Sequence, residues 1–328
     1  MNINELSDIW HLPLPWEIEP IAGSSHNHLA LITAADQQRH VLCTYAHEQP
    51  ALIEFSYAVV HAVAEHGVSF ALPVPKPTKT GQDWHLYDDG YRAWLMTMTP
   101  WYAGDHPAVD DIAAATRTGA ALAELMQACQ AIQVPVVSPP AYGLFHRIHP
   151  YIIDPLASLR GAPIAGDGAI RIVQMLGDLL QSVPDLYQQL PTQIIHGDFT
   201  HRNLILRDDA VFAVLDFEAS RVDLRIVEVA IALLSWGSFD DNHDSQAIQA
   251  LLHALLPTIV LSDAELNALP TALRMVRMVR LMLAIGRYQQ GVERSVVVER
   301  AAHTLLHLDG WLQAHGERFV AELSEIHA

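Results

Sequence analysis

Polar side chains that could do chemistry are concentrated in residues 194–220, which read "IIHGDFTHRNLILRDDAVFAVLDFEAS". Short apolar runs flank this cluster, a pattern that predicts buried strands joined by a loop. A carboxylate that is removed from water without a partner is strongly destabilising. Asp198 and Asp216 therefore need a compensating partner, and the identity of that partner bears directly on function.

The spacing within this segment indicates metal-dependent phosphoryl transfer. Asp198 and Asn203 lie in one loop, and a hairpin around residues 207–210 is expected to bring Asp216 back beside Asn203. Amide and carboxylate oxygens suit Mg²⁺, while a second carboxylate can orient a hydroxyl and accept its proton. The alternative is that His196 and Asp198 only stabilise a buried turn. The ordered set of His196, Asp198, Asn203 and Asp216 favours the catalytic interpretation.

The elements that must position this segment divide into two lobes. Alternating residues on either side of 34–38 and of the Asp89–Gly90 turn predict a small antiparallel sheet, with one helix over residues 50–67. Further helices are predicted over residues 109–132, 170–183, 225–237, 245–256, 262–288 and 295–326, with a loop-rich passage over 132–168. We expect an α+β protein with an N-terminal lobe at 1–98 and a helical lobe at 99–328. A cleft between two lobes is a favoured ligand site.

Composition narrows the class of protein. The net charge of −18 argues against nucleic-acid binding, which needs a surplus of Lys and Arg. The two cysteines, Cys43 and Cys129, are too few for a disulfide framework or a cysteine zinc site. The first 20 residues lack the pattern of a signal peptide, and no long apolar run predicts a membrane span. We therefore expect a cytoplasmic protein that binds neither nucleic acid nor a membrane, with no indication of its oligomeric state.

The sequence resembles the aminoglycoside phosphotransferase and choline kinase superfamily, which has a protein-kinase-like fold. The resemblance extends from about residue 20 to 310, and the "HGD" at 196–198 with the following Asn203 and Asp216 carries it most specifically. Three stretches resemble type II homoserine kinases more closely: "VLCTYAHE", "VEVAIALLSWGSF" and "LPTALRMVRMVRLMLAIGRY".

This resemblance implies an ATP- and Mg²⁺-dependent kinase that transfers the γ-phosphate to an alcohol group. The acceptor would be a small amino alcohol or an amino acid such as homoserine. Asp198 would be the base, His196 would brace its loop, and Asn203 and Asp216 would bind the metal. The nucleotide would lie against Gly23, Ser24, Ser25 and Asn27 of the first hairpin and against Met98 in the hinge expected near residues 97–104.

Several positions leave alternatives open. The substrate-side candidates are Glu218, Glu228, Trp236 and Arg277, of which Glu218 could instead be an exposed residue and Trp236 a core residue. Arg277 shares one side of a predicted helix with Arg274, Arg280 and Arg287, which could bind an anion or form salt bridges. Cys43 and Ser56 stand where many relatives place a Lys–Glu pair. Two interpretations compete with a homoserine-type kinase. The protein could be an aminoglycoside or choline-type kinase, or it could be a non-catalytic binding or regulatory protein of kinase fold.

Overall fold

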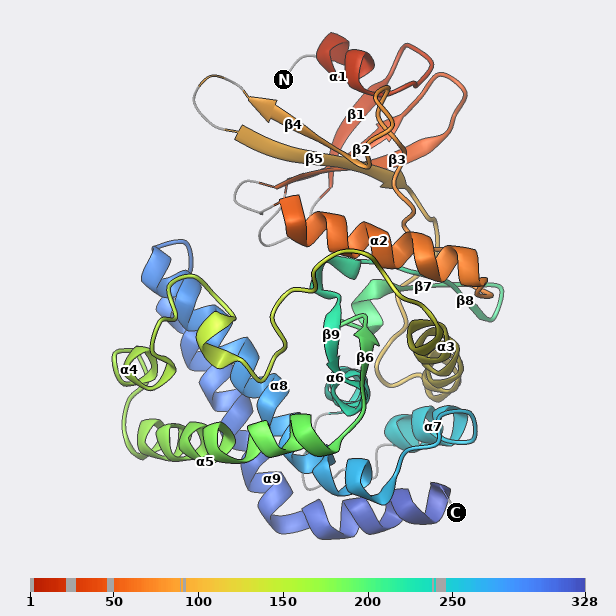
Figure 1. Cartoon of the computed structure of the whole chain (residues 1–328). Coiled ribbons are helices and arrows are strands. Elements are labelled where there is room, and N and C mark those ends of the chain that lie inside the picture. The colour runs from red at the N-terminus through yellow and green to blue at the C-terminus, as the bar shows by residue number, and fades with distance from the viewer. Residues whose placement is uncertain are drawn as a thin grey trace.

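The computed structural model describes residues 3–21, 28–45, 50–88, 90, 93–237, 239 and 246–327. An antiparallel five-stranded sheet dominates the N-terminal region, with the strand order β1-β2-β3-β5-β4. Its strands are β1 (Glu17–Ile21), β2 (His28–Thr33), β3 (Arg39–Tyr45), β4 (Trp84–Asp88) and β5 (Ala93–Pro100). Helix α1 (Ile3–Ile9) lies beyond the sheet, and helix α2 (Pro50–His66) lies between the sheet and the C-terminal region (Figure 1).

Strand β3 separates two hydrophobic cores because its side chains alternate between the two faces of the sheet. Leu42 packs with Trp10 and Met98 in a small core on the face that α1 covers. Cys43 and Tyr45 point to the opposite face and join the main core, which continues into the helices. The predicted alternation along this strand is therefore confirmed, and it places Cys43 and Tyr45 on the side of α2.

The C-terminal region is mostly helical. Its helices are α3 (Ile112–Ala131), α4 (Pro155–Arg160), α5 (Asp167–Gln189), α6 (Arg225–Trp236), α7 (Gln246–Leu255), α8 (Asp263–Gln290) and α9 (Ser295–His327), with a 3-10 turn η1 at Phe145–Arg147. Helix α6 has nearly all its residues buried, and α8 and α9 pack against each other along one side of it (Figure 1). Among the described residues no helix is long and apolar enough to cross a membrane.

Two small sheets carry the polar segment. Strand β6 (Thr192–Ile195) pairs with β9 (Arg221–Leu224), and β7 (Leu204–Arg207) pairs with β8 (Ala210–Val214). The α+β class and the hairpin over 204–214 are as the sequence predicted. Elements α1, β1, α4 and β9 were not predicted, and α5 continues through Pro184 to Gln189. The division into lobes after residue 98 stays a prediction.

Candidate active site

The loop between β6 and β7 depends on a glycine at its second position. Gly197 has φ +80°, and a Cβ placed there would collide with the carbonyl oxygen of Ala219. The carbonyl oxygen of Gly197 itself accepts a hydrogen bond from the Tyr142 hydroxyl at 2.8 Å. The close approach of two loops thus requires glycine, which gives the "HGD" sequence a structural reason.

His196 braces this loop from inside the protein. Its Nε2 lies 2.9 Å from the carbonyl oxygen of Leu215, and its Nδ1 accepts the backbone N–H of Asp198 at 3.2 Å. The ring packs against Phe217 with centroids 4.4 Å apart. Burial lowers the pKa of His196 to about 4, so the ring is neutral near pH 7. The side chain can hold the loop in place but is not open to a substrate.

Glu228 holds the same loop from helix α6, and its role differs from the prediction. The carboxylate is fully buried, and its Oε2 accepts the backbone N–H groups of His196 and Gly197. A side chain in this position cannot reach a substrate, so the substrate assignment for Glu228 is corrected to loop positioning. Sequence spacing could not show this, because the partners lie about thirty residues apart in the chain.

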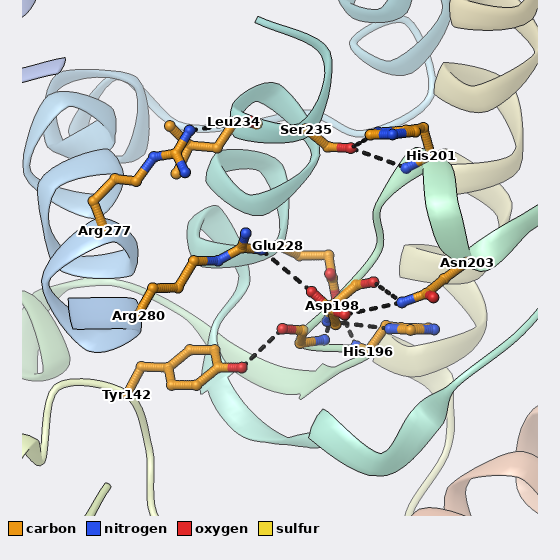
Figure 2. A network of polar contacts seen from close by, with 11 residues as sticks. Tyr142, His196, Asp198, His201, Asn203, Glu228, Leu234, Ser235, Arg277 and Arg280 are labelled. Carbon is orange, nitrogen blue, oxygen red and sulfur yellow. Dashed lines mark hydrogen bonds and ion pairs between the residues drawn. The ribbon is translucent and has the colours of Figure 1, made fainter. Parts of the chain in front are cut away.

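Asp198 lies at the centre of a polar network that is open to solvent on one side (Figure 2). Its Oδ2 accepts a hydrogen bond from Nδ2 of Asn203 at 2.9 Å, and its Oδ1 accepts one from Arg280 at 3.2 Å. Burial raises the pKa of Asp198, although Arg280 and Asn203 act in the opposite direction. The carboxylate is half exposed, with 39% of its side-chain surface accessible, so a hydroxyl-bearing molecule can approach it.

Asp216 follows strand β8 and lies next to Asn203. The neighbouring Leu215 donates its backbone N–H to the carbonyl oxygen of Asn203 at 2.8 Å. Asp216 has a left-handed backbone with φ 62° and begins the 3-10 turn η3 (Phe217–Ala219). Burial by the surrounding protein and then the charge of Asp198 raise the pKa of Asp216 to about 6, although the side chain remains accessible to water. The predicted meeting of the two hairpin ends is confirmed.

The oxygen atoms near this point fit a magnesium ion that is shared with a nucleotide. Nδ2 of Asn203 is committed to the carboxylate and carbonyl oxygen of Asp198, which leaves Oδ1 as its acceptor. In the part of the chain that the structure describes, no three His, Cys, Asp or Glu side chains form a metal cluster. Mg²⁺ commonly uses one or two protein carboxylates and completes its shell with water and phosphate oxygens. Asn203 and Asp216 suit such a site.

Two contacts from the N-terminal region hold the segment after Asp216. The Tyr45 hydroxyl donates to Oε1 of Glu218 at 2.6 Å, and the Ser56 hydroxyl donates to the carbonyl oxygen of Phe217 at 2.7 Å. Burial, and then the charge of Glu218, raise the pKa of Tyr45, so the phenol keeps its proton and donates. These neutral donors from β3 and α2 connect the two regions of the protein. Glu218 thus contributes to the contact between the N-terminal sheet and the segment after Asp216. Its position in the sequence did not indicate this role.

The other predicted site residues fall into four groups. Met98 is fully buried in the small core beyond the sheet, so its side chain cannot contact a nucleotide and that prediction is wrong for the side chain. Trp236 is buried in the main core beside His201, as the packing alternative predicted. Arg277 reaches the carbonyl oxygen of Leu234 at 3.4 Å (Figure 2), and it is among the residues that line a cavity. Gly23, Ser24, Ser25 and Asn27 lie outside the described residues.

A pH dependence of stability follows from Glu228. Burial raises its pKa from near 4.5 to about 7, so the folded protein binds more protons than the unfolded chain between these values. Stability therefore falls as pH rises through this window, by up to about 3 kcal/mol from this one group. We expect Glu228→Gln, which cannot ionise, to lose less free energy of unfolding than the wild type between pH 4.5 and 8.

Urea unfolding of both proteins at pH 4.5 and pH 8 measures this difference. Asp198, Asp216 and Asp223 also have raised pKa values, but they are present in both proteins. Their contributions cancel when the pH-dependent changes are subtracted. Equal changes in the wild type and the variant would show that Glu228 is not the group responsible.

Comparison with known proteins first identifies the fold. An amicoumacin kinase solved in complex with AMP-PNP and Ca²⁺ superposes with a TM-score of 0.71, at 16% identity, over 94% of this chain and 92% of that chain. A microcompartment-associated aminopropanol kinase superposes with a TM-score of 0.68, at 15% identity, over 98% of both chains. The sheet-and-helix architecture is therefore a protein-kinase-like fold of the kind found in small-molecule kinases.

Sequence comparison then identifies the family. The model of the phosphotransferase enzyme family matches residues 17–266, so the chain belongs to this family. A homoserine kinase of Rhodopseudomonas palustris (strain HaA2) is 35% identical over 89 residues. That match spans 26% of this chain and 27% of the homoserine kinase, about a quarter of the length of each protein.

Proposed function

We propose that this protein is an ATP- and Mg²⁺-dependent kinase that phosphorylates a hydroxyl group of a small molecule. The convergence of Asp198, Asn203 and Asp216 at one point of the loop carries the proposal. A small amino acid or amino alcohol, homoserine first, is the proposed acceptor. The partial match to homoserine kinase and the fold shared with an aminopropanol kinase support that choice.

Each residue of the site has a defined part in this proposal. Asp198 orients the acceptor hydroxyl and takes its proton as the phosphoryl group is transferred. Asn203 fixes the rotamer of Asp198 through its amide nitrogen and offers its oxygen, with the carboxylate of Asp216, to Mg²⁺. When bound, the metal neutralises charge on the phosphate oxygens. His196 and Glu228 keep the loop in the conformation that brings these groups together.

The absence of a lysine on β3 favours a second candidate, a kinase-fold protein that binds nucleotide without turnover. The chain has two lysines, Lys76 and Lys79, and neither lies on β3. Initial rates of ADP formation separate the two candidates, measured over a panel of amino alcohols, hydroxy amino acids, aminoglycosides and choline with Mg²⁺ or with EDTA. Acceptor-dependent, EDTA-sensitive turnover supports the kinase. Nucleotide binding without turnover on any acceptor would support the binding protein.

Cys43 tests how the nucleotide phosphates are neutralised without that lysine. Its thiol is buried in the main core beside the residues of α2, where it acts as a packing residue. We expect Cys43→Ala to change the ATP KM by less than about threefold, well below the 1.4 kcal/mol of a tenfold effect. Steady-state kinetics with varied ATP measures this. A tenfold or larger rise in KM, with folding preserved by circular dichroism, would place Cys43 at the phosphates.

A further inference from the structure

A cavity of about 290 Å³ lies between helices α8 and α9, and its lining is strongly basic. Arg277, Arg280 and Arg287 from α8 and Arg300 from α9 lie around it, with Glu293 as one carboxylate among the lining residues. This composition is notable in a chain with a net charge of −18. Four arginines against one carboxylate in the lining favour an anion in this space, because guanidinium binds carboxylate and phosphate groups through two parallel hydrogen bonds.

Arg277 lacks a full set of hydrogen-bond partners within the described residues. Its Nε is buried and unpaired, and one terminal nitrogen makes a single long contact with Leu234. Arg274, one turn earlier on the same helix, instead pairs with Asp309 at 2.8 Å and does not line the cavity. The salt-bridge alternative therefore holds for Arg274, while Arg277 has no carboxylate partner among the described residues.

The cavity is connected to the candidate base by Arg280. This side chain lines the cavity and donates to Oδ1 of Asp198 (Figure 2). A small molecule could therefore place one end among the arginines and present a hydroxyl to Asp198. The cavity volume corresponds to a metabolite-sized group, at the lower end of the range of small-molecule sites.

We propose that the acceptor substrate carries an anionic group, a carboxylate or phosphate held by Arg277 and Arg300, with the reacting hydroxyl directed to Asp198. This inference rests on the proposed kinase function and narrows its substrate class. It excludes purely cationic acceptors, which include aminoglycosides and choline and also the amino alcohols, and it leaves the amino acid as the proposed acceptor. Such molecules would meet like charge in the cavity, which is destabilising.

Two matched pairs of probes test the proposal. L-homoserine and 3-aminopropan-1-ol differ by a carboxylate, and glycerol 3-phosphate and glycerol differ by a phosphate. Calorimetric titration of each into the protein with AMP-PNP and Mg²⁺ measures binding without requiring turnover, and kcat/KM is measured in parallel with ATP. We expect the member that carries the carboxylate or phosphate, in at least one pair, to bind at least about tenfold more tightly than its partner. A preference within the homoserine pair indicates a carboxylate site, and a preference within the glycerol pair indicates a phosphate site.

Variants then assign the discrimination to the cavity. We expect Arg277→Gln and Arg300→Gln each to reduce the preference for the anionic probe by about tenfold, through the dissociation constant and KM with a smaller change in kcat. Arg300 is exposed, so its variant keeps the test valid if Arg277→Gln folds poorly. Arg318→Gln, which removes an exposed arginine of the same helix α9, is the charge-matched control and is expected to change neither constant.

Four results decide the outcome. Anion-selective binding that both cavity variants weaken, together with turnover of the same probe, supports the proposal. The same binding without turnover of any acceptor supports the anion site in the cavity but overturns the kinase function and the acceptor role of the ligand. Turnover of amino alcohols with no preference for the anionic members overturns the proposal and leaves the kinase function standing. A preference that persists unchanged in both cavity variants also overturns it, because the anion would then bind elsewhere.

Discussion

Asp216→Ala is expected to reduce kcat by at least about a hundredfold, since a bound metal supplies several kcal/mol of charge stabilisation in phosphoryl transfer. The carboxylate is placed beside Asn203 by the β7–β8 hairpin, and the charge of Asp198 contributes to its raised pKa. Removing it therefore relieves repulsion in the metal-free protein. Because the left-handed backbone at this position favours Asn over Ala, Asp216→Asn is the companion variant with less backbone strain.

A binding measurement separates loss of metal from loss of fold. We expect AMP-PNP with Mg²⁺ to raise the thermal midpoint of the wild type more than AMP-PNP with EDTA, and this Mg²⁺-dependent increment to disappear in Asp216→Ala. Asp178→Ala, an exposed position on α5, is the control and is expected to keep both activity and increment. A variant at Asp216 with near-native kcat, or with the full Mg²⁺-dependent increment, would remove Asp216 from the metal site.

Local patterns in the sequence predicted the parts of the fold that local physics determines. Alternation placed Cys43 and Tyr45 on one face of β3, and the hairpin over 204–214 followed from two short apolar runs around a polar turn. Helical spacing predicted a helix over residues 262–288, and α8 forms there with a capping box between Ser262 and Glu265. Strand β9 was missed because four residues carry too little pattern, and pairing with distant β6 determines its conformation.

The functional partners were less predictable because they are distant in sequence. Tyr45 and Glu218 lie 173 residues apart, and Arg280 lies 82 residues from Asp198. The three-and-four spacing of arginines on α8 was visible, but spacing alone left both alternatives open. The structure shows a different partner for each arginine. Arg274 forms a salt bridge with Asp309, whereas Arg280 pairs with Asp198 of the candidate site. A helix face is thus shared between a structural salt bridge and the candidate site.

Asp198→Asn is expected to lower kcat by roughly a hundredfold or more, the effect of removing a positioned base, with little change in the ATP KM. The substitution keeps an oxygen that can accept from Nδ2 of Asn203, so the loop geometry is expected to persist. It removes the negative partner of Arg280, but that pair is solvent-exposed and contributes less than about 1 kcal/mol to stability. The main loss therefore falls on the chemical step.

Arg280→Gln distinguishes a base from a mere partner of the arginine. If Asp198 acted only by holding Arg280 at 3.2 Å, the two variants would lose the same activity, and the double variant would lose no more than either. If Asp198 takes the proton, we expect Asp198→Asn to reduce kcat far more than Arg280→Gln, whose effect falls mainly on the acceptor KM. Steady-state kinetics with both substrates varied measures this split. A collapse of ATP affinity in Asp198→Asn with kcat retained would instead assign Asp198 to the nucleotide.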